Sequence, residues 1–318
     1  MIEGKKIFIT GGAGFIGSAL IEKLIGENEI TVYDNFSRDA LSKREIFNSK
    51  NLTIVKGNIT DREKLEEVIG GHHLVLNLAA VAGIDTVILN PVETMRVNLM
   101  GAFNVLESIV NSCKGCERFI TFSTSEVFGS NAFRSEETDQ TVLGAVGEAR
   151  WTYAVSKLAS EHLTFAYSKQ YGLPSVIIRP FNVYGPGQIG EGAIRTFILK
   201  AIKDEDIEIH GDGTQIRAWC YLDDMVDGIL LCMEKEKAVG ESFNIGNSKA
   251  VVTIYGLANT VVRVCNSKSR IKFTRKDYVD VELRVPSVKK AMEILGFEAK
   301  VDLEEGILRT AEYYRKLL

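Results

Sequence analysis

One short segment, TGGAGFIG at residues 10–17, constrains the fold of this chain more than any other. It follows the apolar run KKIFIT and leads into a helix-period pattern over residues 15–25. Gly11 permits a tight turn, Gly14 lets the backbone approach a pyrophosphate, and Gly17 allows the helix to pack closely on the strand. The helix N-terminus then faces the negative charge of that group. The segment therefore predicts a dinucleotide-binding turn between a strand and a helix.

Apolar strand-like runs and helical segments alternate along the first 180 residues. Near-continuous apolar strands that alternate with helices are typical of a parallel sheet covered on both faces. Because crossovers between parallel strands are right-handed, we expect a doubly wound sheet. Strands are expected at residues 5–10, 30–34, 52–60, 73–80, 118–123 and 175–180, and helices at residues 15–25, 61–69, 91–110 and 153–171.

The pattern changes after Pro180. The stretch YGPGQIGEG indicates a loop, and the segments beyond it lack the alternation of strand and helix. We predict an α/β fold, with a doubly wound parallel sheet (Rossmann) and a smaller mixed α/β lobe that binds substrate. The dinucleotide-binding domain is expected at residues 1–180 and the second lobe at residues 181–318, while segments of 222–250 can return to the first domain.

The charge balance and the hydropathy pattern argue against several classes of partner. Charged residues make up 25% of the 318 residues and the formal net charge is −4, so nucleic acid is not an expected partner. No apolar run reaches the roughly 18 residues of a membrane span, so no membrane partner is expected. The first residues lack the apolar core and cleavage site of a signal peptide, which predicts a cytoplasmic protein.

The five cysteines form no recognisable framework. Their odd number and scattered spacing argue against structural disulfides. Cys113 and Cys116 form a CxxC pair, but no second pair completes a tetrahedral metal site. We interpret them as ordinary thiols at a helix end, the alternative being a redox or zinc pair. The four histidines show no ligand spacing, and no metal site is predicted.

An acidic residue, Asp34, ends the second expected strand about 20 residues after the glycine segment. In a dinucleotide-binding fold, an acid at this place binds the hydroxyls of the adenosine ribose. The same acid disfavours the 2′-phosphate of NADP. The sequence therefore predicts NAD as the cofactor.

Five motifs in the order TGGAGFIG, LNLAA, STSEVFG, YAVSK and RPFNVYGPGQ resemble the extended short-chain dehydrogenase/reductase family, and within it the nucleotide-sugar epimerases, dehydratases and decarboxylases. The resemblance covers essentially the whole chain. It implies tightly held NAD, a UDP-sugar substrate in the second lobe and a homodimer formed through a four-helix bundle. One departure is GNI, where the family often has GDI. The cofactor-binding residues that it implies are Gly11, Gly14, Phe15, Ile16, Gly17, Asp34, Asn35, Asn58, Ile59, Leu78, Ala79, Ala80, Asn98, Ser123, Tyr153 and Lys157.

Tyr153 and Lys157 are the expected catalytic pair. Their i, i+4 spacing places both side chains on one face of a helix. A cation near a phenol favours the phenolate, so we expect a lowered pKa for Tyr153 and a role as general base. The resemblance adds Thr124, which would hydrogen-bond the same sugar oxygen. The shared first step would be hydride transfer from sugar C4 to NAD⁺, which gives a 4-keto intermediate.

Ser125 and Glu126 narrow the choice of reaction. Family dehydratases have Thr-Asp-Glu here, so Ser125 in place of the Asp disfavours elimination of water. Decarboxylases of UDP-glucuronate often have Thr-Ser-Glu, and Glu126 therefore favours a uronate substrate. The alternative for Glu126 is a structural carboxylate that caps backbone N–H groups or pairs with an Arg.

Longer stretches point in two directions. GEARWTYAVSK and DVELRVPS resemble UDP-glucuronate decarboxylases, whereas the region from NLAAVAG to NVLE resembles ordinary epimerases. The leading expectation is a 4-epimerase of UDP-glucuronate or UDP-glucose. The enzyme alternative is a UDP-glucuronate decarboxylase, and the non-enzyme alternative is an NAD-binding regulatory relative. Intact Thr124, Tyr153 and Lys157 argue against the last.

The resemblance also implies contacts to the nucleotide part of the substrate. Asn182 matches the residue that contacts the diphosphate, and Arg217 and Arg284 match its phosphate-binding arginines. Arginine suits this role because its planar fork bonds phosphate through two N–H groups. His210 would lie beside the base.

A uronate carboxylate would need a further cation. Some uronate epimerases place an Arg three residues after the Pro of YGP, but that position is Ile189 here. Arg195 is the substitute that we expect to bind substrate, the alternative being an ordinary Arg on a helix face.

Overall fold

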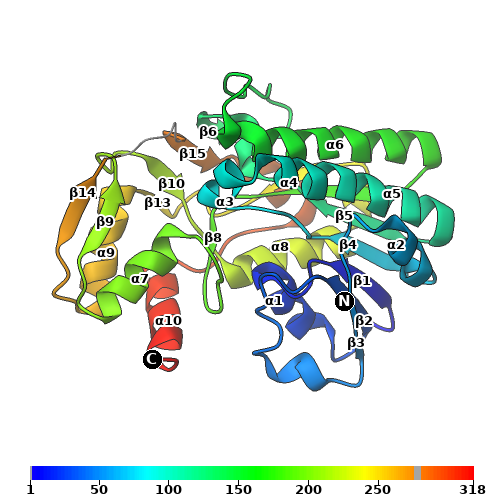
Figure 1. Ribbon diagram of the computed structural model, residues 1–318, viewed down its shortest axis with the longest axis horizontal. Helices are drawn as coiled ribbons and strands as arrows, with labels where there is room; N and C mark the ends of the chain where they lie inside the picture. Colours follow the sequence, from blue (N-terminus) through cyan, green and yellow to red (C-terminus); the bar gives the residue numbers. More distant parts are fainter. Residues whose placement is uncertain (1, 276–280) are drawn as a thin grey trace.

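The larger lobe is built on a seven-stranded sheet in the order β12-β7-β5-β4-β1-β2-β3, and every neighbouring pair is parallel (Figure 1). The computed structural model describes residues 2–275 and 281–318. The strand order reverses between β1 and β4, and ligands of such sheets bind outside the carboxyl ends of the strands at this point. The strands are β1 (Lys6–Thr10), β2 (Glu29–Asp34), β3 (Leu52–Lys56), β4 (Leu74–Asn77), β5 (Arg118–Phe122), β7 (Ser175–Pro180) and β12 (Ser242–Ile245).

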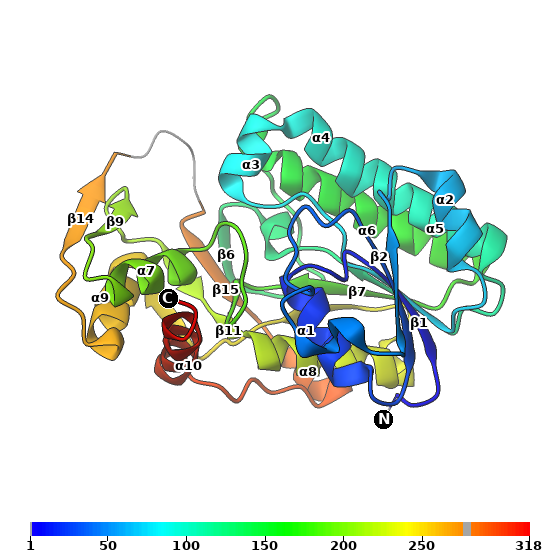
Figure 2. The ribbon, with the colours of Figure 1, turned by 60° about the horizontal axis from the view of Figure 1, so that its bottom comes forward.

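Helices cover both faces of this sheet. On one face lie α1 (Phe15–Leu24) and α8 (Leu222–Glu234), which pack against each other (Figure 2). On the other lie α2 (Arg62–Ile69), α5 (Gly101–Ser112) and α6 (Thr152–Tyr171). Two short helices, α3 (Ile84–Leu89) and α4 (Pro91–Met95), precede α5.

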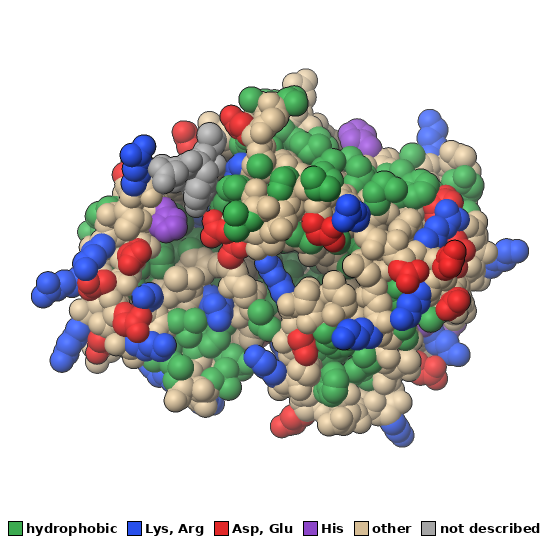
Figure 3. Space-filling model, viewed as in Figure 1, with side chains coloured by type: hydrophobic (Ala, Val, Ile, Leu, Met, Phe, Trp, Pro, Cys, Tyr) green, Lys and Arg blue, Asp and Glu red, His purple; other side chains and the backbone are tan. Residues whose placement is uncertain are grey.

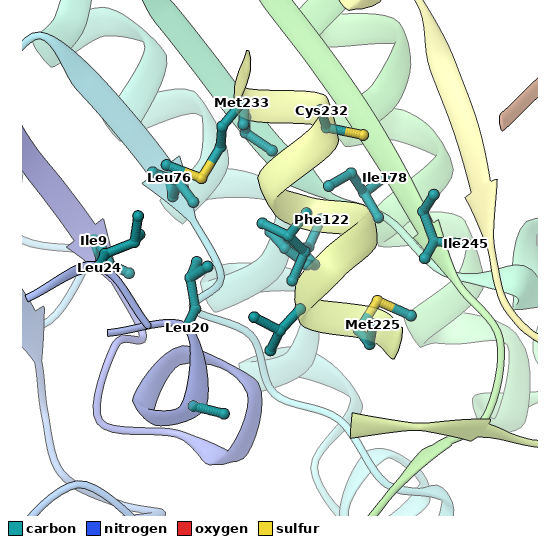
Figure 4. Close-up of a cluster of buried hydrophobic side chains, with 14 of the residues drawn as sticks. Ile9, Leu20, Leu24, Leu76, Phe122, Ile178, Met225, Cys232, Met233 and Ile245 are labelled. Carbon is teal, nitrogen blue, oxygen red and sulfur yellow. The ribbon is translucent and has the colours of Figure 1, made fainter. Parts of the chain in front are cut away.

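The main hydrophobic core lies between the sheet and the α1–α8 layer (Figure 4). This cluster joins Leu20 and Leu24 of α1 and Met225 and Met233 of α8 to strand residues, among them Ile9, Leu76 and Ile178. Each fully buried side chain of this kind contributes about 1.5–3 kcal/mol to folding. This core therefore fixes the strands whose carboxyl ends carry the candidate site.

Over its described residues, the smaller lobe combines three small sheets with three α-helices. Its four-stranded sheet has the order β13-β10-β15-β6, and β8–β11 and β9–β14 form two-stranded parallel sheets. Its strands are β6 (Asn131–Ser135), β8 (Val183–Tyr184), β9 (Ile207–His210), β10 (Ile216–Ala218), β11 (Cys220–Tyr221), β13 (Val251–Thr253), β14 (Ile271–Thr274) and β15 (Leu283–Pro286). Its helices are α7 (Ala193–Ile202), α9 (Ile254–Cys265) and α10 (Leu303–Arg315).

The predicted fold class is confirmed, and three elements differ clearly from the prediction, one of them the fourth strand, which ends at Asn77 instead of at residue 80. The third strand ends at Lys56, because Gly57 packs against Tyr33, where a side chain would come within 2.3 Å of the ring. The helix expected over residues 91–110 is interrupted by a π-helical turn at Arg96–Met100 and continues to Ser112. Such turns are rare and frequently lie at functional sites.

Chain segments cross between the lobes in both directions. Residues 222–245 form α8 and β12, of which β12 joins the large sheet and α8 covers it. In the other direction, β6 precedes residue 180 but lies in the four-stranded sheet of the smaller lobe. The first residue of the DVELRVPS stretch lies outside the described residues. Within the described residues, none of the helices has the length and apolar character needed to cross a bilayer.

Candidate active site

The glycine turn between β1 and α1 has the geometry that the sequence predicts. Gly11 has φ +69°, and a Cβ there would lie 2.5 Å from the backbone N of Ala79. A Cβ on Gly17 would lie 2.7 Å from the Cα of Gly12. At Gly14 the nearest protein atom would be the carbonyl oxygen of Gly11 at 3.2 Å, a tight contact but a less severe one than at Gly11 and Gly17. The first turn of α1 receives no side-chain cap, which leaves its N–H groups to face a ligand.

Asp34 closes the cofactor side of this turn. Its carboxylate accepts from the backbone N–H of Ala13 at 2.9 Å and of Phe36 at 2.7 Å. Burial raises its pKa above the ordinary value, although the two N–H groups oppose the shift. Beside it, Asn35 accepts from the Ser37 N–H at 2.9 Å. The uncapped helix, the glycine turn and this held carboxylate together fit a dinucleotide.

The segments that follow β3 and β4 are also expected to contact the cofactor, and hydrogen bonds and packing hold both in place. Asn58 accepts from the Thr60 N–H at 3.1 Å, and Ile59 packs where Gly101 starts α5. Asn98, in the π-helical turn, accepts from the Val81 N–H at 2.8 Å and donates to the Val81 carbonyl at 3.0 Å. It thereby fixes the loop that follows Leu78, Ala79 and Ala80.

The expected catalytic side chains meet at the carboxyl end of β5. The Thr124 hydroxyl accepts from the Glu126 N–H at 3.2 Å and hydrogen-bonds the Tyr153 hydroxyl. Lys157, buried one turn further along α6, donates to the Phe122 carbonyl at 2.7 Å. Two residues of STSEVFG flank Thr124: Ser123 is fixed through its N–H to Ile178 at 2.7 Å, and Ser125 is buried.

The protonation states differ from the expectation for Tyr153. Burial raises the pKa of Tyr153, and the negative charge of Glu126 raises it further. Burial lowers the pKa of Lys157 to about 8, opposed by the charge of Glu161. The expected net lowering of the Tyr153 pKa is therefore not found, because burial and Glu126 outweigh the positive charges of Arg284 and Arg38. A cationic nicotinamide ring would add the positive charge that ionisation of the phenol needs.

A buried cluster of one carboxylate and two guanidinium groups adjoins Tyr153. Arg150 donates to Glu126 at 2.6 Å and 3.2 Å, and Arg284 donates to it at 3.3 Å. Burial acts to raise the pKa of Glu126, but the charges of Arg284 and Arg150 outweigh it and hold the pKa below the ordinary value. Glu126 is thus an anion at neutral pH. We refer to Glu126, Arg150 and Arg284 as the carboxylate cluster.

Of the remaining residues predicted to bind substrate, only Arg217 is linked to this cluster by the contacts described below. Arg217 is the register partner of Arg284 in neighbouring strands and donates to the Ile216 carbonyl at 3.0 Å. Asn182, with φ +37°, donates to the Ala218 carbonyl at 2.7 Å. Arg195 on α7 instead donates to Gly190 at 3.4 Å and lies over the Tyr314 ring. His210 is exposed at the end of β9. Their roles with substrate stay predictions.

Three residues at or near the site were not predicted from the sequence. Arg150 lies within GEARW, 24 positions from Glu126, and the only signal in the sequence was that this stretch resembles UDP-glucuronate decarboxylases. Arg38 donates to the Ala82 carbonyl at 2.8 Å, and its charge acts on Tyr153. Glu191 of the second lobe accepts from Thr86 Oγ1 at 2.8 Å. Arg38 and Glu191 lie in loops, where no periodic pattern marks a contact between lobes. Figure 3 shows the surface hollowed between these lobes.

Comparison with known proteins identifies the family. The sequence profile described as the NAD dependent epimerase/dehydratase family matches residues 7–246. A UDP-N-acetyl-alpha-D-glucosaminuronate decarboxylase of Bacillus cytotoxicus is 34% identical and covers 98% of both chains.

Two solved structures share the fold over the same length. A UDP-glucose 4-epimerase of Thermotoga maritima with UDP-glucose has a TM-score of 0.89 and 32% identity, and covers 98% of this chain and 99% of its own. A UDP-glucuronic acid 4-epimerase of Bacillus cereus, in complex with UDP-glucuronic acid and NAD, has a TM-score of 0.89 and 26% identity, and covers 98% and 100%. This chain belongs to the NAD dependent epimerase/dehydratase family, the extended short-chain dehydrogenase/reductases that use NAD.

Proposed function

We propose that this chain is an NAD-dependent decarboxylase that oxidises C4 of a UDP-linked uronic acid and releases C6 as CO₂. The observation that carries the proposal is the carboxylate cluster beside Tyr153. The similarity over the whole chain to a decarboxylase of a UDP-linked uronate supports it. The 4-epimerase that the sequence favoured becomes the second candidate.

The oxidation needs a base, a second hydrogen-bonding group and a cation. Bound NAD supplies the acceptor for the hydride that leaves C4. Tyr153 takes the proton of the C4 hydroxyl, and Thr124, bonded to the Tyr153 hydroxyl, is placed to donate to the same sugar oxygen. Lys157, on the same face of α6, supplies positive charge to the ionised phenol.

Oxidation converts the uronate into a β-keto acid. The C5–C6 bond then breaks, its electron pair moves into an enolate that ends on O4, and C6 leaves as CO₂. Thr124 and Tyr153 are the hydrogen-bond donors for that oxygen. A proton adds to C5, and the ketone is reduced again at C4 while Tyr153 returns its proton to O4, which gives a UDP-linked pentose.

The charge of Glu126 favours loss of the substrate carboxylate. Arg150 and Arg284 keep Glu126 ionised although it is buried. A second carboxylate in this pocket is attracted by the two arginines and repelled by Glu126, and conversion to neutral CO₂ removes the repulsion. The same arginines can orient the departing group, because a guanidinium bonds a carboxylate in its plane.

The 4-epimerase remains the second candidate because of the two solved 4-epimerases of the same fold. An epimerase needs the same oxidation, after which the keto sugar turns and receives the hydride on its opposite face. The two reactions differ in the pose of the ring. CO₂ leaves readily only when the C5–C6 bond stands perpendicular to the plane of the ketone.

Product analysis separates the candidates. Purified protein is incubated with NAD⁺ and, in separate reactions, UDP-glucuronate, UDP-N-acetylglucosaminuronate and UDP-glucose, and the products are followed by NMR. The proposal predicts a UDP-linked pentose or amino-pentose and one CO₂ per sugar. A 4-epimer that keeps its carboxylate would overturn it in favour of the epimerase, and no turnover of any sugar would favour the regulatory alternative.

We also propose a cytoplasmic homodimer that buries one face of the helical layer α3–α6. Large apolar side chains are exposed along this layer: Leu89, Val92, Met100, Val155 and Phe165. Antiparallel helices of two copies would form a four-helix bundle on such a face. Sedimentation of the wild type and of Phe165→Glu tests the proposal, since the charge should dissociate the dimer.

We also propose that the chain divides into two domains at residue 180, with residues 222–245 assigned to the first domain.

A further inference from the structure

A tight turn between α5 and β5 brings two cysteines together. Cys113 is the C-cap residue of α5, and the Cys116 N–H donates to the Cys113 carbonyl at 3.1 Å. Gly115 has φ +91° at the third position of the turn. The first and fourth Cα atoms of a β-turn lie within about 7 Å of each other. A disulfide needs a Cα separation of about 4.4–6.8 Å, so the backbone has the spacing that a Cys113–Cys116 disulfide requires.

The two thiols interact with each other and with neighbouring carbonyls. Their side chains share a hydrogen bond, which lowers the pKa of Cys113 and raises that of Cys116. The Sγ of Cys113 lies 3.2 Å from the His72 carbonyl, and that of Cys116 lies 3.4 Å from the Arg118 carbonyl. Thiols are weak donors, so little hydrogen-bond energy is lost when their hydrogens leave.

Both cysteines of the pair differ from the other three in having a thiol partner, and Cys116 also differs in accessibility, since Cys113 is buried like the others. Cys220, Cys232 and Cys265 are buried in the hydrophobic clusters, and burial raises the pKa of each. Cys116 is only partly buried, which gives an oxidant in solution access to one sulfur of the pair. Thiolate character and access are the two requirements for thiol–disulfide exchange.

We infer that Cys113 and Cys116 form a redox modification site, a dithiol that a small-molecule disulfide oxidises reversibly to an intramolecular disulfide. Loss of one proton from the pair leaves one proton shared between the two sulfurs, and with that proton on Cys113 the accessible Cys116 thiolate attacks the small disulfide, whose S–S bond breaks and releases one thiol. The Cys113 thiolate then attacks Cys116 and displaces the second thiol. In total, two protein thiols lose two protons and two electrons, and one small disulfide becomes two thiols.

The site is separate from the candidate active site. The turn lies at the amino end of β5, whereas Thr124 follows its carboxyl end. The inference is therefore independent of the proposed function, and its test does not require a known substrate. It also revises the interpretation from sequence, in which the CxxC pair was two ordinary thiols.

The test equilibrates the native, full-length protein with oxidised glutathione, alkylates the remaining thiols in denaturant and digests the protein with trypsin. Because Lys114 lies between the two cysteines, cleavage there leaves two peptides joined only by the new bond. We expect three of the five thiols to be alkylated and the two peptides to be found linked. A reductant should restore five alkylated thiols.

Two variants control the assignment. Cys265→Ser removes a buried thiol elsewhere and should still yield the linked peptides. Cys116→Ser should abolish them, because Cys113 then has no partner in the turn. The inference is overturned if all five wild-type thiols are alkylated, if the reaction stops at a glutathione adduct, or if the lost thiols belong to Cys220, Cys232 or Cys265.

Discussion

Both oxygens of the Glu126 carboxylate are bonded by the Arg150 guanidinium, at 2.6 Å from Nη1 and 3.2 Å from Nη2. The Arg150 side chain is 6% exposed and that of Glu126 is 13% exposed. A guanidinium and a carboxylate that meet in one plane fix each other's orientation. Arg150 therefore positions Glu126 at the place where its charge acts on Tyr153.

We expect Glu126→Gln to separate the two halves of the proposed reaction. Glutamine has nearly the same shape but no charge, so oxidation at C4 should stay within about tenfold of wild type. Release of CO₂ should fall by about 100-fold or more, because the repulsion that favours neutral CO₂ is lost. Single-turnover absorbance of NADH measures the first step, and trapped CO₂ measures the second.

Glu148→Gln is the matched control, since Glu148 accepts from the Trp151 indole at 2.8 Å, close to the carboxylate cluster in sequence. It should leave both rates nearly unchanged. Equal losses of both rates in Glu126→Gln would contradict a role for its charge in decarboxylation.

The features that could be predicted from the sequence are those set by a local residue pattern or by a position at the end of a strand. The glycine turn, Asp34 and the Tyr153–Lys157 pair follow from spacing along one turn or one helix, and parallel strands bring their carboxyl ends together. Contacts between side chains or strands that lie far apart in the sequence leave no comparable pattern in the sequence. Arg150 meets Glu126 from 24 positions away, and β6 joins β15 across an even longer separation. The protonation of Tyr153 depends on its burial and on the charge of Glu126, and neither can be inferred from the YAVSK motif that contains Tyr153.

The three glycines of the cofactor turn should respond differently to alanine. Gly11→Ala and Gly17→Ala place a methyl group 2.5–2.8 Å from backbone atoms, so each should lower the free energy of unfolding by more than about 1 kcal/mol. Gly14→Ala should cost less, because its φ of −70° is allowed and its nearest atom is 3.2 Å away.

The same Gly14→Ala variant should nevertheless lose affinity for NAD, because the methyl group enters the path of the pyrophosphate. Urea unfolding without cofactor measures stability, and calorimetric titration measures binding. Wild-type affinity in Gly14→Ala would show that the backbone does not approach the cofactor there.

Tyr153→Phe should lower kcat by about 100- to 10,000-fold, the usual contribution of a general acid–base residue. The aromatic ring is kept and only the hydroxyl is lost, so the variant should fold and bind NAD as the wild type does. Tyr167→Phe is a suitable control on the same helix, because its hydroxyl bonds Glu107 instead of the site. Activity of Tyr153→Phe within a few-fold of wild type would remove Tyr153 as the base.

Burial of Lys157 should make the stability of the cofactor-free protein depend on pH. Its pKa is about 8 in the folded protein, against 10.5 ordinarily, because burial disfavours the ammonium. Below about pH 8 both states carry the charge, and the folded state bears the full penalty of burying it. Between about pH 8 and pH 10.5 the unfolded chain binds more protons than the folded one, so the free energy of unfolding should rise with pH.

The rise attributable to Lys157 should reach about 3 kcal/mol across this interval, at about 1.4 kcal/mol for each pKa unit. Other groups titrate in the same range, so the informative quantity is the difference between the wild type and Lys157→Met, which cannot ionise. Urea denaturation at several pH values should show a smaller rise in the variant. Parallel curves for the two proteins would mean that the Phe122 carbonyl and the charge of Glu161 stabilise the ammonium enough to offset its burial.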